Sequence, residues 1–357
     1  MLNTYKKGEH RRINHYLKQH YDVYTSSFDL LGGKNNMATY LRKRAITGIL
    51  VILVSLSITF FLIHLSPGNP ITILAGTDNP SPEMIETLNE KYGLDQPIHV
   101  QFFKYIGSLL RGDLGYSIMN NEPVLDLILE RLGPTLLLAL TGLILAAIIG
   151  TILGIYAARK NGSKFDVFMS GVSYIFDAMP PFWLGMMLIL IFASVFNLFP
   201  TSGMVDLRAS PEGVGYYLSV AQHLVLPLAT IVLTQIPFFY RIARSSVIQT
   251  MSEDFITTYR ATGMDEGKIF RKYVFKNSIL PTITMFGISL AYVIAGVAII
   301  EIVFAWPGMG RLLLDSIMKR DYPLLMGIYL FLSIAIAVTM ILVDVVYSII
   351  DPRIKNT

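Results

Sequence analysis

The chain has 357 residues, of which 53% are hydrophobic and only 15% are charged, and its formal net charge is +4. Soluble domains carry about one-quarter charged residues, so this composition excludes an ordinary soluble protein and predicts an integral membrane protein. The chain contains no cysteine, which excludes disulfides, thiolate nucleophiles and cysteine-ligated metal sites.

Long stretches without Asp, Glu, Lys or Arg mark the expected membrane spans. A helix needs about 20 apolar residues to cross about 30 Å of hydrocarbon, and six uncharged stretches are long enough. The predicted fold class is therefore all-α, with six transmembrane helices. The six stretches are residues 45–77, 132–158, 178–205, 213–240, 277–300 and 322–343.

The N-terminal region, residues 1–44, is predicted to be a cytoplasmic tail before a first transmembrane helix at 45–65. Residues 1–36 are polar and basic without an apolar core, so they do not form a signal peptide. They are expected to be a mobile tail, or to precede a translation start at Met37. Lys and Arg near the span ends set orientation and place both termini, including residues 351–357, in the cytoplasm. These basic residues are Arg42, Lys43, Arg44, Arg159, Lys160, Lys164, Arg241, Arg244, Arg353 and Lys355.

Residues 66–133 are predicted to form an extracytoplasmic loop with nine acidic and four basic residues. Structureless loops of that length are uncommon, so helices are expected in it. Three segments carry helix boundary signals or helical apolar spacing and predict a helical outer layer: "SPEMIETLNEKYG", "HVQFFKYIGSLLRG" and "PVLDLILERLG". The last outer loop is a mild exception to the charge rule, because it holds Arg311, Lys319 and Arg320.

Residues 134–350 are predicted to form a five-helix core built from bent helices. Asp177 is expected near mid-membrane, and Pro180 and Pro181 remove backbone donors and bend the helix beyond it; Pro227 and Pro237 are expected to act similarly in span four. A carboxylate at this depth is costly unless it is paired, protonated or hydrated. Asp177 is therefore expected to line a pathway, to bond to another helix, or to couple to protons.

Two further acidic residues lie near span ends. Glu301, at the outer end of span five, is expected either to line a gate or to have an interfacial structural role, and Asp344 is expected to be solvated. No G-x-x-x-x-G-K-[ST] loop and no H-E-x-x-H motif is present, so the chain is not expected to bind ATP by a P-loop or to be a zinc enzyme. His64 and His223 are interpreted as wet interfacial residues, and no metal site is predicted.

A basic segment between spans four and five, "YRATGMDEGKIFRKYVFKNSILP" (259–281), requires its own explanation. A helix is expected to begin near Ser252 to Asp254 and to break at Gly263, and Asp265 can cap a second helix. In that second helix, Ile269, Phe270, Tyr273 and Val274 share one face and Lys268, Arg271 and Lys272 the other, before Ile279, Leu280 and Pro281 turn into span five.

This amphipathic pattern leaves two interpretations open. The helix can rest on anionic lipid head groups, or its apolar face can dock in a groove of a cytoplasmic partner.

The segment resembles the cytoplasmic "EAA" loop of ABC importer permeases, with Gly263 followed by Leu280-Pro281 at the spacing of the peptide-type members. Arg260-Ala261-Thr262-Gly263 is similar to their Arg-Ala-x-Gly, although Thr257-Thr258-Tyr259 stands in place of Glu-Ala-Ala. Further stretches resemble, in order, the first permease subunit of dipeptide, oligopeptide and nickel importers, over about residues 37–354. They are "LSPGNP", "YGLDQPI", "GDLGYS", "PPFWLG", "EIVFAWPGMGRLLLDSIMKRDYP" and "DVVYSIIDPRI".

The resemblance implies a type I ABC importer permease in the cell membrane, which forms half of a pore and is not itself an enzyme. Its implied partners are a second permease subunit, two ATPase subunits that bind ATP and Mg, and an extracytoplasmic substrate-binding protein, with no nucleic acid. The implied cargo is a di- or oligopeptide, nickel or a metal chelate. A cytoplasmic coupling loop is expected at 241–281, with Tyr259, Arg260, Ala261, Gly263, Asp265, Ile269, Phe270, Tyr273, Leu280 and Pro281. Candidate pathway or gate residues are Asp177, Pro180, Pro181, Glu301 and Trp306, and the Trp306 region is also expected at the outer docking surface.

A stand-alone secondary transporter or channel remains the alternative, and would use Asp177 and Glu301 to bind ions. An intramembrane enzyme is disfavoured because nucleophile-base and metal patterns are missing.

Overall fold

The computed structural model describes residues 37–65, 81–92, 96–206 and 212–350. Within them the regular elements are helices, with one isolated β-bridge between Tyr116 and Pro123. The chain divides into two compact units, residues 1–49 with 341–357 and residues 50–340. The second unit contains all the sites described below. The predicted tail at 1–36 and C-terminus at 351–357 lie outside the described residues.

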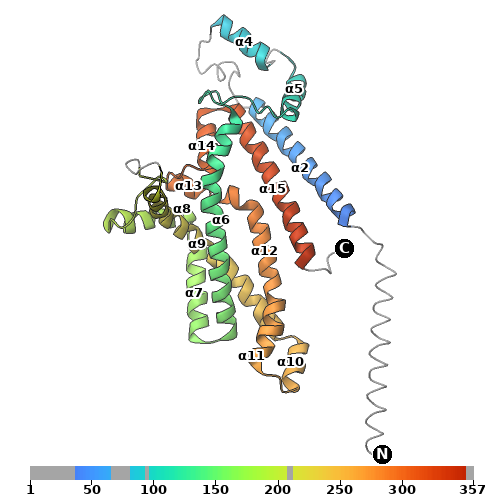
Figure 1. The fold of residues 1–357 in the computed structure, drawn as a ribbon, viewed down its shortest axis with the longest axis vertical. Helices are drawn as coiled ribbons and strands as arrows, with labels where there is room; N and C mark the ends of the chain where they lie inside the picture. The colour runs from blue at the N-terminus through green and yellow to red at the C-terminus, as the bar shows by residue number, and fades with distance from the viewer. Residues whose placement is uncertain (1–36, 66–80, 93–95, 207–211, 351–357) are drawn as a thin grey trace, which may run out of the picture. The chain divides into compact units, whose positions relative to one another are not determined.

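Figure 1 shows the helices, coloured in their order along the chain. They are α2 (Met37–Leu65), α4 (Pro82–Tyr92), α5 (Ile98–Leu110), α6 (Val124–Arg159), α7 (Lys164–Ala178), α8 (Pro181–Leu188), the π-helical η1 (Ile189–Val195), α9 (Val214–Met251), α10 (Asp254–Ala261), α11 (Glu266–Ile269), the π-helical η2 (Phe270–Val274), α12 (Phe275–Gly296), α13 (Ala298–Val303), α14 (Met309–Lys319) and α15 (Tyr322–Ile350).

The predicted six spans are confirmed as five helices and one broken pair. Five helical stretches in α2, α6, α9, α11 to α12 and α15 are long and apolar enough to cross a membrane, and the number rises to six if α7 with α8 and η1, a pair bent by 100°, is one span. The bend lies at Pro180 and Pro181, as expected from their missing backbone donors. Helix α7 begins at Lys164, before the uncharged stretch, and includes Asp177, which was expected within the third span.

The outer layer is partly as predicted. Helices α4 and α5 form at the first two predicted segments, but the third segment is the beginning of α6, which runs through Pro134 without a break. A single proline inside a long helix removes only one backbone hydrogen bond, and the apolar residues on both sides keep the helix continuous. Residues 124–133 of the predicted extracytoplasmic loop are thus helical and continuous with α6.

Helices α6 and α9 pack against each other through small residues. Added Cβ atoms on Gly150 and Gly154 would collide with the α9 backbone at Ile236 and Tyr240, and one on Gly142 would collide with Ile231. Small residues allow helix backbones to approach closely where lipid supplies no hydrophobic driving force between helices. Helix α9 is continuous through Pro227 and Pro237.

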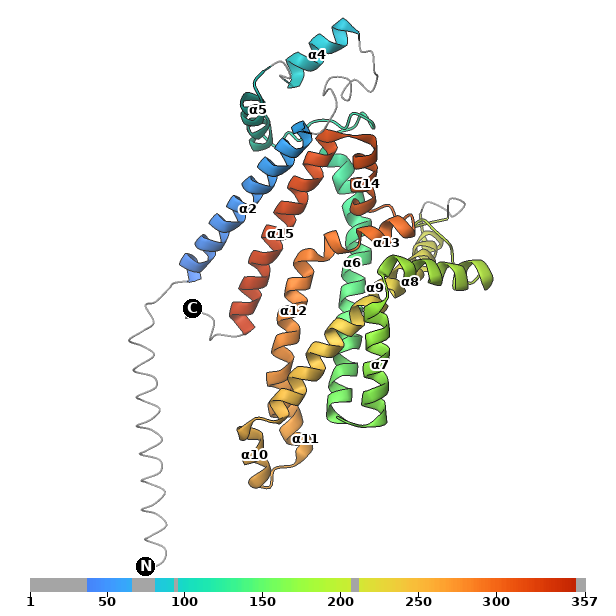
Figure 2. The same cartoon turned by 180° about the vertical axis from the view of Figure 1, so that it is seen from behind.

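The two ends of α6 carry different functional features. Val124, Leu127 and Ile128 at its N-terminal end pack with α14 and α15, whereas Ala158 at its C-terminal end packs with α9, α10, α11 and η2. Figure 2 shows α14 and the α10 to α11 segment at these opposite ends.

Candidate functional site

The segment from α10 to η2, hereafter the tip, has the predicted helix, glycine elbow and second helix. Gly263 has φ +77°, a left-handed conformation that glycine adopts without a steric cost. The backbone amide of Gly263 donates to the carbonyl of Arg260 at 2.9 Å, and that of Met264 donates to the carbonyl of Tyr259 at 3.2 Å. The side chain of Asp265 accepts from the amide of Lys268 at 3.0 Å, so the predicted cap is confirmed.

The predicted turn at Leu280 and Pro281 is wrong. Helix α12 begins at Phe275 and contains Pro281 in its interior, directly after η2. The wider π-helical turn of η2 and the one backbone donor that Pro281 lacks are both accommodated within a continuous helix. The non-helical connections within the predicted coupling loop 241–281 are residues 262–265 and, before α10, Ser252 and Glu253.

The apolar face of the second helix is not free to dock on a partner. Ile269 and Val274 are each 1% exposed and pack with Ile256 of α10, Val247 of α9 and Ala158 of α6. The apolar stripe is covered by this chain's own helices, because they meet at this end of the bundle. The prediction that this face enters a partner's groove is therefore corrected.

Aromatic and charged contacts hold the tip together. The rings of Tyr259 and Tyr273 lie 4.2 Å apart between centroids, and the guanidinium of Arg159 lies 4.6 Å from the centroid of Phe270. Arg260 forms a 2.7 Å ion pair with Glu266 across the elbow, which raises the pKa of the Arg260 side chain.

One face of the tip stays exposed and is available to a partner. It comprises the solvent-exposed side of α10 and the elbow, and we call it the tip surface. Leu280 and Pro281 lie outside it, on α12. The tip surface consists of Phe255, Thr257, Thr258, Arg260, Ala261, Thr262 and Gly263.

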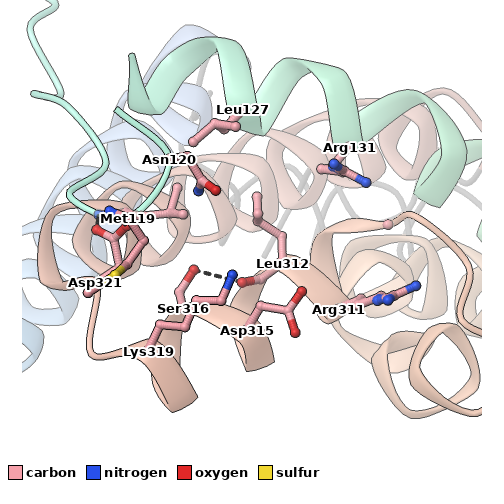
Figure 3. Close-up of a pocket in the computed structure, with 12 residues that line it drawn as sticks. Met119, Asn120, Leu127, Arg131, Arg311, Leu312, Asp315, Ser316, Lys319 and Asp321 are labelled. Atoms are coloured by element: carbon pink, nitrogen blue, oxygen red, sulfur yellow. Dashed lines mark hydrogen bonds between the residues drawn. The ribbon is translucent and has the colours of Figure 1, made fainter. Parts of the chain in front are cut away.

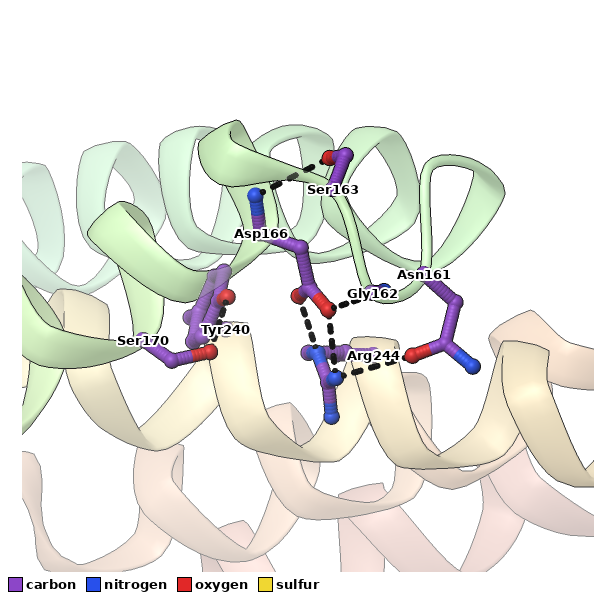
Figure 4. Close-up of polar contacts among 7 residues, drawn as sticks. All are labelled: Asn161, Gly162, Ser163, Asp166, Ser170, Tyr240 and Arg244. Carbon is purple, nitrogen blue, oxygen red and sulfur yellow. Dashed lines mark hydrogen bonds and ion pairs between the residues drawn. The ribbon is translucent and has the colours of Figure 1, made fainter.

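The first turn of α7 is bound to α9 by an ion pair (Figure 4). Arg244 donates from Nε and Nη2 to the two carboxylate oxygens of Asp166 at 2.6 and 2.8 Å, and the amide of Gly162 donates to the same carboxylate at 3.0 Å. Asp166 is 3% exposed, so this is a buried, two-point contact. Neither residue was assigned this role from the sequence.

Further polar contacts extend this connection. Ser163 caps α7 by accepting from the amide of Asp166 at 3.3 Å, and Ser170 shares a 3.0 Å hydrogen bond with Tyr240 of α9. Arg244 also donates to Asn161 at 3.2 Å. Helices α6, α7 and α9 are thereby joined at the end of the bundle that carries the tip.

Asp177 lies at the end of α7 and is paired with Arg241 of α9 at 2.6 Å. The two side chains are 44% and 39% exposed, respectively, so the pair is only partly covered by the chain. Bonding to another helix was one of the roles expected for Asp177, but the sequence reasoning assigned Arg241 only to the cytoplasmic boundary. The pairing is possible because the long side chain of Arg241 extends away from its backbone position and brings the guanidinium to Asp177.

Glu301 is fully buried in a polar cluster beneath the N-terminus of α14. Its carboxylate accepts hydrogen bonds from the hydroxyl of Thr135 at 2.6 Å and from the amides of Gly310 and Arg311 at 2.7 and 3.3 Å. An added Cβ on Gly308 would collide with the carboxylate. Glu301 therefore does not line a gate surface and has a structural role, the other of the two roles expected for it, because its carboxylate satisfies the free amides of a helix start.

Trp306 is likewise buried, with 0% exposure, and its indole Nε1 donates to the carbonyl of Pro134 at 3.0 Å. The expectation that Trp306 contributes to an outer docking surface is wrong. The large apolar ring packs in the core beside Phe304 and Leu138, where its burial contributes most to the stability of the fold. The roles of Thr135, Gly308 and Gly310 were missed by the sequence reasoning. The spacing Glu-x₆-Gly-x-Gly is not a recognisable motif by itself, because the buried contact also needs Thr135 on α6.

No group of three His, Asp or Glu side chains with the placement of metal ligands occurs in the described part of the chain. The side chains of His64 and Asp344 lie outside the described residues. His223, expected to be wet, is partly buried, and its Nδ1 lies 2.8 Å from the carbonyl of Ser219.

Comparison with known families gives two matches that together span most of the chain. The model of the binding-protein-dependent transport system inner membrane component matches residues 150–356, and the model of the N-terminal part of such membrane components matches residues 37–139. The chain belongs to this family of transport permeases.

Similar permeases are found in several bacteria. This permease is 33% identical over 320 residues to the oligopeptide transport system permease protein AppB of Bacillus subtilis, covering 89% of this chain and 100% of the relative. It is 35% identical over 318 residues to the dipeptide transport system permease protein DppB of Escherichia coli K12, covering 84% and 93% of the two chains.

The permease fold also resembles a solved structure. A chain of the MetNI methionine ABC transporter in an inward-facing conformation superposes with a TM-score of 0.51 at 15% identity, covering 64% of this chain and 97% of that one. This likeness concerns the fold.

The family assignment confirms the resemblance found in the sequence. The protein is a multi-pass permease of the inner membrane, of the ABC importer type, and transport permeases are not enzymes. Its family depends on binding proteins for transport.

Proposed function

We propose that this permease is the membrane-spanning subunit of an ATP-driven importer of di- or oligopeptides. The cargo assignment is supported by its relatives, which are named as oligopeptide and dipeptide transport permeases. Nickel and metal chelates are the second cargo class, carried over from the family resemblance.

The tip is proposed to be the link to an ATPase subunit, and the observation that carries this proposal is the tip surface itself. Ile256, Ile269 and Val274 of the tip are buried against α6 and α9, while Phe255, Thr258 and Ala261 remain exposed. A partner that binds the tip surface would move α9 and α12 directly, because both helices continue from the tip into the membrane. ATP and Mg would be bound by that partner.

The proposed complex contains one second permease subunit, two ATPase subunits and one extracytoplasmic binding protein. Both termini and the tip would face the cytoplasm, in keeping with the basic residues at those span ends. Alternating access would then arise from two arrangements of the packed helices, between which nucleotide or loaded binding protein selects.

The Asp177 and Arg241 pair is proposed to face the translocation pathway. An ion pair that is partly exposed on the surface of spanning helices is costly against hydrocarbon, so its open side is expected to meet water or the second permease. The bend at Pro180 and Pro181 would give the pathway its change of direction. Glu301 and Trp306 would support the outer gate from within, by fixing α13 and α14 to α6.

The experiment is to purify the tagged permease from its native membrane in mild detergent, identify all co-purifying proteins by mass spectrometry, and reconstitute the complex. We expect a second permease and P-loop ATPases, together with ATP-dependent uptake of labelled di- and tripeptides. A chain that purifies alone and carries out gradient-driven transport in liposomes would instead establish the secondary transporter.

A further inference from the structure

Basic residues on the outer side of the permease gather around one cavity. Arg311 and Lys319, which depart from the inside-positive distribution, line it together with Arg131 of α6. The cavity has a volume of about 280 Å³. Figure 3 shows Arg131 and Leu127 of α6 on one side and Arg311, Asp315 and Lys319 of α14 on the other.

One of the two carboxylates in the wall is already engaged. Asp321 is 1% exposed and accepts hydrogen bonds from the hydroxyl of Ser117 at 2.5 Å and from the amides of Met119 and Leu324 at 3.2 and 3.3 Å. These contacts fix the loop before α6 to the start of α15. Asp321 is therefore a structural acceptor that keeps its negative charge in the wall of the cavity.

The cations have few partners of their own. The Nε of Arg131 is buried without a hydrogen-bond partner, and its Nη2 lies 3.5 Å from the exposed carboxylate of Glu130. Arg311 donates from Nη1 to the carbonyl of Ala305 at 2.8 Å. In the part of the chain that the structure describes, neither Arg311 nor Lys319 forms an ion pair.

The balance of charge in the cavity is positive. Three cations face two carboxylates, Asp315 and Asp321, and no hydrogen bond engages Asp315 in the described part of the chain. Covered donors without an acceptor cost free energy, and an arriving carboxylate would recover it. Arginine is well suited to such a contact, because its planar fork matches a carboxylate at two points.

We propose that this cavity receives an aspartate or glutamate side chain of the extracytoplasmic binding protein. The proposal rests on the proposed function and names the partner surface used on the outer side. The cavity, at about 280 Å³, lies at the lower end of the roughly 300–1,000 Å³ of ordinary ligand pockets, which favours a single side chain over a whole peptide.

Zero-length cross-linking tests the proposal directly. The reconstituted complex is mixed with its co-purifying binding protein and treated with a carbodiimide, which joins an amine to a carboxylate that it touches. The Asp315→Asn background removes the carboxylate that stands four residues before Lys319. We expect Lys319 to be joined to an Asp or Glu of the binding protein. The variant Lys319→Arg, which keeps the charge but has no amine, should lose this product and still bind. Lys104→Arg, on α5, should retain it.

Affinity supplies the second measurement. Arg311→Gln should raise the Kd of the binding protein by about tenfold and weaken its salt dependence. Asp315→Asn should lower the Kd severalfold, because it removes the competing negative charge. A site with only a structural role would show no gain in affinity. Lys104→Gln is the matched control, since it removes one exposed positive charge outside the cavity.

The outcomes separate this inference from the proposed function. Retention of a binding protein whose affinity is unchanged in both Arg311→Gln and Asp315→Asn would overturn the inference alone. Cross-linking of Lys319 to the second permease, or its shielding by a bound anionic lipid in native mass spectrometry, would also overturn it. A complex that retains no binding protein at all would overturn the proposed function and this inference together.

Discussion

The hydroxyl of Thr135 donates a 2.6 Å hydrogen bond to the buried carboxylate of Glu301, although 166 residues separate the two along the chain. The same hydroxyl oxygen accepts from the amide of Met309 at 2.7 Å. Thr135 thus connects α6 to both α13 and the first turn of α14. The outer end of the permease depends on this single side chain for two buried polar contacts.

Replacement of that hydroxyl should therefore destabilise the protein. Thr135→Val leaves the Glu301 carboxylate and the Met309 amide each without one partner, and each buried unsatisfied group costs about 1–3 kcal/mol. We expect the thermal unfolding midpoint of the purified permease to fall by several degrees. Thr135→Ser, which keeps the hydroxyl, should remain close to wild type. Equal midpoints for the valine and serine variants would show that the hydroxyl contributes nothing.

Two arginines on α9, three residues apart, should respond differently to truncation. Arg244→Ala leaves the buried Asp166 carboxylate unpaired and should destabilise the permease by about 3–5 kcal/mol. Arg241→Ala removes a partly exposed pair and should cost about 1 kcal/mol or less. Chemical denaturation in detergent compares them. If Arg241→Ala proves the more damaging, the assignment of the structural contact to Asp166 and Arg244 is wrong.

Loss of the Asp177 charge should affect transport more than stability. Asp177→Asn keeps the shape of the side chain and a hydrogen bond to Arg241 but leaves the arginine charge uncompensated at the proposed pathway. We expect the maximal rate of peptide uptake to fall several-fold while abundance and thermal stability are unchanged. A parallel loss of abundance and uptake would assign the pair to folding alone.

The elbow of the tip should not tolerate proline. Gly263 has φ +77°, whereas proline fixes φ near about −65°. Gly263→Pro should abolish uptake without preventing membrane insertion. Gly263→Asn should keep most of the uptake, because asparagine adopts the left-handed conformation more readily than most residues. Normal uptake by the proline variant at normal membrane abundance would refute the coupling role of the tip.

The two faces of the tip should separate ATPase binding from folding. Ala261→Trp places a large ring on the exposed tip surface and should prevent co-purification of the ATPase subunits at unchanged stability. Ile269→Ala truncates a residue that is 1% exposed and should instead destabilise the permease by about 2–5 kcal/mol. If Ile269→Ala releases the ATPase and leaves the unfolding midpoint intact, the apolar face and not the tip surface would be the contact.

Features with local causes were predictable from the sequence. The uncharged stretches gave the spans, the elbow followed from Gly263, and the cap followed from Asp265 three residues before its amide donor. Each depends on residues within one or two helical turns. The bend after α7 belongs to the same group, because Pro180 and Pro181 act on the backbone next to them.

Features that depend on distant partners were not predictable. Periodicity identified the face that holds Ile269 and Val274, but what covers that face lies on α6 and α9. Likewise, the burial of Glu301 depends on Thr135, far upstream in the chain. A single sequence without contacts gives no measure of such pairings, so an apolar face or a carboxylate could be assigned to a partner that the chain itself supplies.

The covered apolar stripe of the tip also bears on how the complex is put together. In the proposed orientation, a tip that is already folded keeps Ile269 and Val274 away from cytoplasmic chaperones and proteases before any partner binds. The proposed ATPase subunits can then bind last, and dissociate again, without unfolding the tip. Folding of the permease in the membrane and binding of the proposed ATPase subunits then become separate steps, and each can be monitored by the cell independently.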